Sequence, residues 1–178
     1  MPRRSADTRA EIREVATELF AAQGIEQTSL REIAERLDIT KAALYYHFPS
    51  KDELIAELVR PMVADIEAFH TDVTSTAPGD LRPLLGRYLD LCHRHRLLFQ
   101  GLLRDIAVLG RLDVLSTVLE KRAEVDRVLV GGDAPADRVR AVIALGGLQD
   151  CVVLMADEPL ESYREAAVDS ALRALRPA

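Results

Sequence analysis

The sequence predicts an all-α protein of about nine helices, and three observations support this class. Helix-capping residues precede most of the periodic segments, and glycine or proline follows several of them. No segment shows the alternation of apolar and polar residues that a half-buried strand requires. Apolar residues recur at helical spacing along most of the chain, as in Ile12, Val15, Ala16, Leu19 and Phe20.

Composition indicates a packed, water-soluble protein. The chain has 178 residues, of which 48% are hydrophobic, which is enough for a core. No apolar run reaches the ~18–20 residues that cross a bilayer, and the charged N-terminus differs from a secretion signal, so we expect a cytoplasmic location. Cys92 and Cys151 lie far apart and are expected to be free thiols. The net charge of −6 argues against nucleic acid only weakly, because phosphate contacts depend on local charge.

The N-terminal domain, residues 1–50, is predicted to contain three short helices. Thr8 and Ser29, each followed three residues later by glutamate, mark two capping boxes. Thr40 is the expected N-cap of a third helix that ends near His47. The second and third helices are separated by about three residues, which is the layout of a helix-turn-helix module.

The third helix is predicted to have a distinctive outer face. Leu44 and Phe48 are spaced to point into a small core, which leaves Lys41, Tyr45 and Tyr46 outside. Exposed neighbouring tyrosines are unfavourable for solubility, and stacking on sugar or hydrogen bonding to phosphate would explain them. Residues 36–51 carry three basic residues against one acidic residue, a mild local excess of positive charge. The alternative is that one or both tyrosines belong to the core.

Residues 51–178 are predicted to form a second, larger helical domain. A long linking helix is expected over 51–76, opened by a capping box at Ser50 and kinked at Pro61, which cannot donate a backbone hydrogen bond. Polar residues, proline and glycine follow it and indicate a linker. Further helices are expected over 81–109 (two helices with a break near His93–His95), 113–130, 135–156 and from 157 onward.

Residues 28–54, TSLREIAERLDITKAALYYHFPSKDEL, resemble the DNA-binding domain of the TetR (tetracycline repressor) family. The run Leu-Tyr-Tyr-His-Phe-x-x-Lys at this spacing is specific, and the resemblance covers roughly the first third of the chain. One departure is Asp38, where the family usually has glycine in the turn. Aspartate tolerates left-handed backbone better than most residues, so we expect the turn to be kept. Ile12, Ala16, Phe20 and Gly24 match the family's first helix.

The resemblance implies a homodimeric, DNA-binding transcription regulator, most simply a repressor. Lysine can donate to guanine and alanine methyls can pack on thymine methyls, so the implied contacts are chemically sensible. Phosphate contacts are implied for Thr28, Tyr45, His47 and Lys51. Approach to base edges is implied for Lys41, Ala42, Ala43 and Tyr46, and Thr40 completes the expected DNA-contacting set.

The last two helices are predicted to form the dimer interface. The first of them carries two adjacent glycines among apolar residues, and the second carries a row of small residues. Small faces let helices approach closely, and two such helices from each subunit would form a symmetric four-helix bundle, as is typical of the family. The alternative is that these faces pack only within the chain. The expected interface residues are Val142, Gly146, Cys151, Met155, Ala167, Ala171 and Ala174.

A pocket for a small, mainly apolar effector is predicted in the second domain. A helical stripe there mixes apolar bulk with a few polar tips, which suits an apolar cavity with orienting groups. The alternative for each of these residues is ordinary core packing. The candidate effector residues are Tyr88, Cys92, His95, Phe99, Ile106 and Gln149.

No catalytic constellation, metal-binding pair or phosphate-binding loop is visible, so we expect neither an enzyme nor a cofactor or metal. A regulator whose effector site is vestigial remains an alternative. A second alternative is a dimerising interaction protein whose reader has degenerated, and selective binding to duplex DNA would separate that from a regulator.

Overall fold

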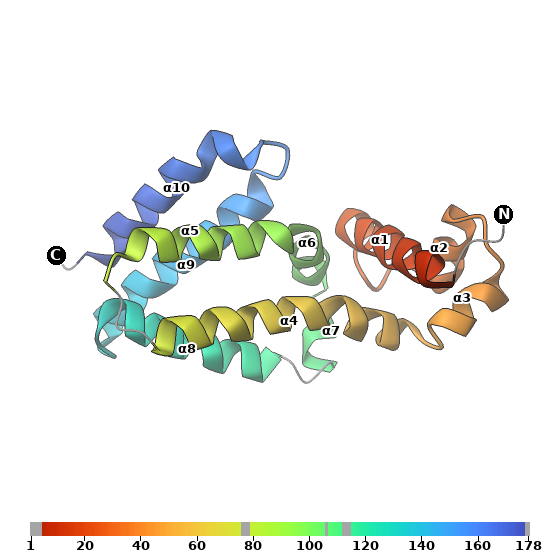
Figure 1. The fold of residues 1–178 in the computed structure, drawn as a ribbon, viewed down its shortest axis with the longest axis horizontal. Coiled ribbons are helices and arrows are strands. Elements are labelled where there is room, and N and C mark those ends of the chain that lie inside the picture. Colours follow the sequence, from red (N-terminus) through yellow and green to blue (C-terminus); the bar gives the residue numbers. More distant parts are fainter. Residues whose placement is uncertain (1–4, 76–78, 106, 112–114, 177–178) are drawn as a thin grey trace. The chain divides into compact units, whose positions relative to one another are not determined.

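The computed structural model describes residues 5–75, 79–105, 107–111 and 115–176 of the chain, and within these ranges it contains ten helices and no strand (Figure 1). The prediction of an all-α fold is confirmed. None of the described helices is both long and apolar enough to cross a bilayer. The helices are α1 (Ser5–Gln23), α2 (Leu30–Arg36), α3 (Lys41–His47), α4 (Lys51–Ser75), α5 (Leu81–Arg94), α6 (Arg96–Arg104), α7 (Ala107–Arg111), α8 (Leu115–Val130), α9 (Pro135–Leu154) and α10 (Leu160–Leu175).

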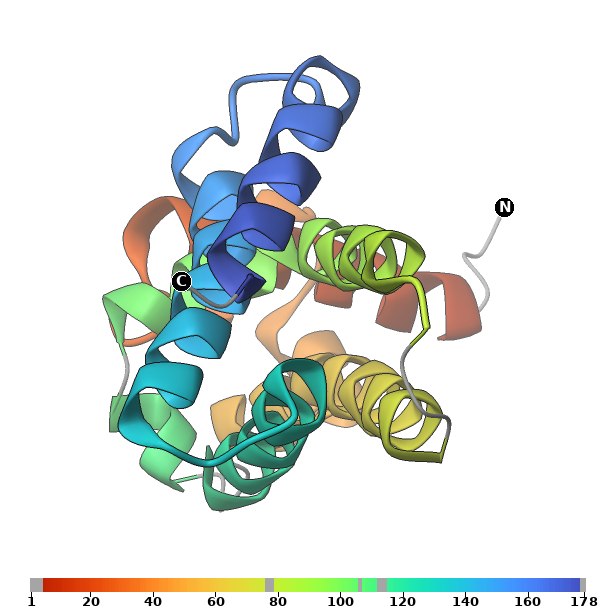
Figure 2. The ribbon, with the colours of Figure 1, turned by 90° about the vertical axis from the view of Figure 1, so that its left-hand side faces the viewer.

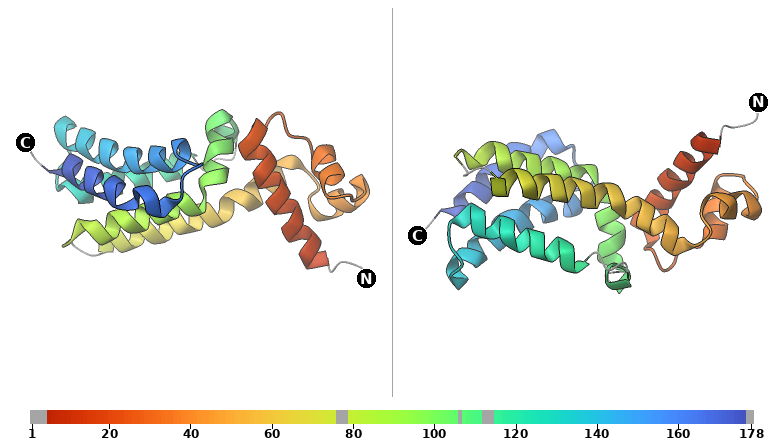
Figure 3. Two further views of the ribbon diagram at one scale, coloured as in Figure 1. Left: turned by 90° about the horizontal axis from the view of Figure 1, so that it is seen from above. Right: turned by 60° about the horizontal axis from the view of Figure 1, so that its bottom comes forward.

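The chain divides into two compact units that differ from the predicted division at residue 50. Unit 1 comprises Met1–Met62 and Leu97–Leu115, and unit 2 comprises Val63–Arg96 and Ser116–Ala178. Helix α4 is therefore shared, with its first half in unit 1 and its second half in unit 2. Both views in Figure 3 show α4 as one continuous helix. The functional division into residues 1–50 and 51–178 stays a prediction.

Most helix boundaries agree with the sequence, and two differ. The break near His93–His95 is confirmed, because α5 ends at Arg94 with His95 as its C-cap. The start of the first helix at Thr8 is wrong. Helix α1 already includes Ser5, and Thr8 lies buried within it. A serine or threonine followed by glutamate three residues later also occurs inside helices, so the motif alone cannot place a terminus. Helix α7 was not predicted as a separate element.

Unit 1 has a small apolar core beneath α3. Phe20, Ile33 and Leu44 are fully buried, and Phe48 is 1% exposed. Leu44 and Phe48 are four residues apart and so lie on the same side of α3. The inward face predicted for α3 is confirmed, and its burial leaves the opposite face of this short helix for solvent or a partner.

The turn between α2 and α3 is a left-handed reversal centred on Asp38. Asp38 has a φ of 52°, as expected from its tolerance of this conformation. The backbone N–H of Asp38 donates to the Glu35 carbonyl at 3.2 Å, and the backbone N–H of Ile39 donates to the Ala34 carbonyl at 3.0 Å. These two bonds form a Schellman motif, which satisfies the last carbonyls of α2 and ends it sharply. The turn therefore fixes where α3 begins.

Unit 2 is a helical bundle in which α5, α9 and α10 pack on one another (Figure 2). One face of α9 supplies Ala141, Ala144, Leu145, Leu148 and Val152 to the core, all at helical spacing. Helix α5 contributes a matching apolar face that includes Leu85 and Leu89, both fully buried.

Asp38→Gly is expected to raise the free energy of unfolding by about 0.5–1 kcal/mol, because glycine adopts positive φ without steric cost. Asp38→Ala is expected to lower it by about 1 kcal/mol, because its Cβ opposes the left-handed conformation. Denaturant titration followed by circular dichroism measures both changes.

Asp52→Gly is the matched control. Asp52 lies in the first turn of α4, where glycine costs about 1 kcal/mol of helix propensity. The same replacement should therefore stabilise at position 38 and destabilise at position 52. An Asp38→Ala protein as stable as Asp38→Gly would contradict the role assigned to this turn.

Candidate nucleic-acid interface

Helix α3 is a short helix held firmly at both ends. At its start the Thr40 hydroxyl accepts a hydrogen bond from the backbone N–H of Ala43 at 3.1 Å, which confirms Thr40 as the N-cap. At its end the Phe48 N–H donates to the Leu44 carbonyl at 2.9 Å. Ser29 and Ser50 cap α2 and α4 in the same way, each accepting from a backbone N–H at 3.1 Å. The three predicted caps thus define the module.

The outer face of α3 carries the predicted DNA-contacting residues. Tyr46 is 80% exposed and Tyr45 is 40% exposed, so the alternative that both tyrosines are core is wrong. The Lys41 ammonium lies 5.5 Å from the centroid of the Tyr45 ring, and the rings of Tyr46 and His47 meet edge to face. Lys41 and Ala42 are exposed, and Ala43 is half-buried. A cation and two aromatic rings therefore share one exposed face.

Arg9 of α1 binds the C-terminal end of α3, a contact that the sequence analysis did not predict. Its Nη1 donates to the backbone carbonyl of His47 at 2.9 Å, at the C-terminus of α3. Its guanidinium lies 4.4 Å from the centroid of the Phe48 ring and also pairs with Glu57 of α4. The hydrogen bond from Arg9 holds the pKa of the Glu57 carboxyl below its usual value. Arg9 thereby ties α1, α3 and α4 together.

Thr28 and Lys51, both expected to bind phosphate, lie in a different setting from the residues of α3. Thr28 is 1% exposed, and its hydroxyl donates to the Gly24 carbonyl at 2.8 Å. The Lys51 ammonium donates to the Glu26 carbonyl at 3.1 Å. Both side chains thus bind the loop between α1 and α2, and phosphate contact by either stays a prediction. Gln23, which donates to Thr28 at 3.2 Å, was also missed.

The predicted dimer residues fall into two groups. On α9 and its C-cap the exposed side chains include Val142 at 56% and Met155 at 37%, while Gly146 and Cys151 are half-buried. On α10, Ala167 and Ala171 are buried within the protomer at 9% and 4% exposure, and Ala174 is half-buried. Ala167 and Ala171 therefore serve packing inside the chain. The exposed apolar face belongs to α9, where it also includes Val139, Ile143 and Leu154.

The predicted effector residues are not brought together at one described site. Phe99 belongs to unit 1, Ile106 lies outside the described residues, and the other four belong to unit 2. Tyr88 and Cys92 are buried one turn apart on α5, and burial raises the pKa of the Cys92 thiol to about 12. The Arg122 guanidinium, absent from the sequence prediction, donates to the Tyr88 hydroxyl at 3.1 Å.

The other two predicted effector residues of unit 2 have different surroundings. Gln149 is half-buried on α9. His95 is hydrogen-bonded to Asp65 of α4 at 2.8 Å. This bond, together with one from Arg94, holds the pKa of the Asp65 carboxyl below its usual value.

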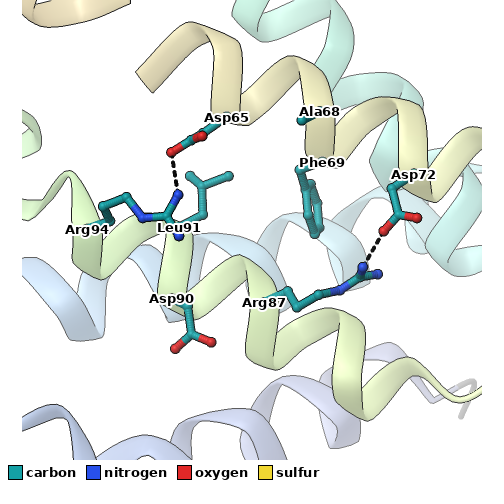
Figure 4. A pocket seen from close by; sticks show the side chains of 8 residues that line it. All are labelled: Asp65, Ala68, Phe69, Asp72, Arg87, Asp90, Leu91 and Arg94. Carbon is teal, nitrogen blue, oxygen red and sulfur yellow. Dashed lines mark hydrogen bonds and ion pairs between the residues drawn. The ribbon is translucent and has the colours of Figure 1, made fainter. Parts of the chain in front are cut away.

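A surface pocket of about 370 Å³ lies between α4 and α5 in unit 2 (Figure 4). Ion pairs cross it, one from Arg94 to Asp65 at 2.7 Å and one from Arg87 to Asp72. None of the predicted effector residues lines it, and its charged walls differ from the mainly apolar lining expected for the effector. Its lining residues are Asp65, Ala68, Phe69, Asp72, Arg87, Asp90, Leu91 and Arg94.

Comparison with known proteins identifies the N-terminal module. Residues 12–58 match the family model described as "Bacterial regulatory proteins, tetR family". The chain is 32% identical over 116 residues to the HTH-type transcriptional regulator AcrR of Shigella flexneri, covering 61% of this chain and 54% of that protein. It is 27% identical over 122 residues to the HTH-type transcriptional repressor KstR2 of Mycolicibacterium smegmatis, covering 65% of this chain and 60% of that protein. The matches thus span little more than half the length of these relatives.

The fold extends the similarity to the whole chain. The crystal structure of Mycobacterium smegmatis AmtR matches with a TM-score of 0.71 and 23% identity, covering 98% of this chain and 89% of that one. At this identity the match speaks for the fold, including the helices beyond the N-terminal module. Residues 12–58 therefore match the tetR family of bacterial regulatory proteins, and the chain as a whole shares its fold with the solved structure of AmtR.

Proposed function

We propose that the chain is a transcriptional repressor that binds a palindromic operator as a homodimer and is released by a small, mainly apolar effector. The observation that carries the DNA-binding part is the exposed face of α3, where Lys41, Tyr45 and Tyr46 stand over a packed core. A helix of this kind enters the major groove in helix-turn-helix proteins. The relatives named repressors support the direction of regulation.

The homodimer is supported by the exposed face of α9. Val139, Val142, Ile143, Gly146 and Gly147 follow one another at helical spacing, and the three large side chains are 55–59% exposed. Apart from the adjacent backbone of α9 itself, a methyl group added to either glycine would meet no atom of the described residues within 4 Å. An apolar face without bulk at its centre suits close packing against the same helix of a second subunit.

The release step is supported by the continuity of α4. The helix contributes residues to both units, so a ligand that shifts α4 within unit 2 acts on unit 1 through the same helix. Tyr88 and Cys92 in the interior of unit 2 are our candidates for lining an effector site, and Arg122 adds a polar group beside them.

Lys41→Ala is expected to change which DNA sequences bind. A lysine at the start of the recognition helix donates to guanine, and loss of that contact should reduce discrimination at one base pair by about tenfold. Tyr45→Phe removes a hydroxyl expected on phosphate and should weaken binding to all sequences by about threefold to tenfold. Competition binding against single-base variants of a selected DNA site measures both effects.

The two variants serve as controls for each other. A uniform loss for Lys41→Ala, or a change of base preference for Tyr45→Phe, would contradict the roles assigned to the two residues.

Ile143→Glu is expected to give a folded monomer that has lost operator binding. Ile143 is 59% exposed, so the protomer tolerates glutamate there, whereas an unpaired charge in a closed interface costs several kcal/mol. A palindrome requires two recognition helices about 34 Å apart, which a monomer cannot supply. Sedimentation velocity measures the assembly state.

Leu119→Glu is the matched control, because Leu119 on α8 is 58% exposed but lies outside the α9 face. It should remain dimeric. If Ile143→Glu also remained dimeric and bound DNA normally, the interface would have to lie elsewhere.

An effector found by thermal-shift screening of small apolar compounds is expected to bind more weakly when operator DNA is present. Linkage requires that the effector and the operator weaken each other by the same factor, about 5–150-fold for couplings of this kind. Calorimetric titration of the compound with and without operator measures that factor. Equal affinities would mean that the compound does not operate the switch, however tightly it binds.

A further inference from the structure

The turn after α6 touches the loop between α1 and α2, although 79 residues separate the two contacting residues in sequence. The backbone N–H of Glu26 donates to the Asp105 carboxylate Oδ2 at 3.0 Å. The same oxygen would lie 2.7 Å from a Cβ placed on Gly24, so it also packs closely on the loop's first residue. Both segments belong to unit 1. Asp105 thus reaches the loop from a part of the chain far outside the helix-turn-helix module.

The contacted loop is held from its other side by residues expected to meet DNA. Lys51 donates to the Glu26 carbonyl at 3.1 Å, while Asp105 accepts from the Glu26 N–H. Thr28, two residues further on, donates to the Gly24 carbonyl at 2.8 Å. The Glu26 backbone therefore lies between an ammonium and a carboxylate, and the Lys51 ammonium is anchored through it.

A second, independent observation shows that α6 is built to approach α1 closely. A Cβ on Gly101 of α6 would lie 3.1 Å from the backbone carbon and oxygen of Phe20, tighter than ordinary van der Waals contact. Phe20 itself is fully buried in the core of unit 1. Glycine at this position lets α6 come near enough for Asp105, four residues later, to reach the loop.

We propose that Asp105 is a positioning residue for DNA binding, which holds the α1–α2 loop in the conformation that anchors Lys51 for contact with the phosphate backbone. This rests on the proposed DNA-binding function. Without the carboxylate, the loop must be ordered at the moment of binding, and the cost of that ordering reduces affinity. Asp105 therefore contributes to affinity although it carries the same sign of charge as DNA.

The direction in which DNA affinity changes when the Asp105 carboxylate is removed distinguishes a positioning residue from an ordinary surface acid. Removing a carboxylate near a DNA-binding surface normally strengthens binding, because one source of repulsion is lost. Loss of a positioning contact weakens binding instead. It leaves the salt dependence unchanged, since no phosphate contact has been removed.

The test compares Asp105→Ala, Asp105→Asn and the wild-type chain for affinity to a selected DNA site over a series of salt concentrations. Asparagine retains a carbonyl oxygen that accepts from the Glu26 N–H, whereas alanine has no acceptor. We expect Asp105→Ala to lose about fivefold to tenfold in affinity and Asp105→Asn to stay within about twofold of wild type. Asp7→Ala, which removes an exposed carboxylate of the same unit, should not weaken binding.

Hydrogen exchange at the Glu26 amide gives a readout that needs no DNA. The amide should exchange faster in Asp105→Ala than in wild type or Asp105→Asn. Equal or tighter DNA binding by Asp105→Ala, or an unchanged Glu26 exchange rate, would overturn the proposal. A wild-type chain that prefers no DNA sequence would instead overturn the proposed function, and the exchange rates would still decide whether Asp105 holds the loop.

Discussion

The exposed face of α3 depends on one backbone reversal, the left-handed turn at Asp38. The Schellman bonds around it end α2, and the Thr40 cap then starts α3 two residues later. That spacing is what puts Leu44 and Phe48 into the core and leaves Lys41, Tyr45 and Tyr46 outside. A helix of seven residues is too short to be stable alone, so its orientation comes from these ends and from the packing beneath it.

The rest of unit 1 reinforces the same arrangement through long-range contacts. Arg9 satisfies a C-terminal carbonyl of α3 and pairs with α4, while Gly101 and Asp105 bring α6 against α1 and its following loop. Helix α4 begins in unit 1 and ends in unit 2.

The sequence was sufficient for what local chemistry determines. The caps at Ser29, Thr40 and Ser50, the inward face of α3 and the break at His95 all follow from short-range patterns, and the structure confirms them. Long-range choices could not be predicted in this way. Small residues on α10 were compatible with an inward or an outward face, and burial of Ala167 and Ala171 was decided by packing against neighbouring helices. The reach of Arg9 and Asp105 depends on tertiary contacts that no spacing in the sequence encodes.

Selection of bound sequences from a random pool of duplex DNA tests the central claim most directly. A dimer presenting two copies of α3 should enrich one motif with two-fold symmetry, whose half-sites are centred about one helical turn or a multiple of it apart. Enrichment should weaken steeply as salt rises, because several phosphate contacts are lost at once. A pool that shows no enriched sequence, or only an asymmetric one, would contradict the account.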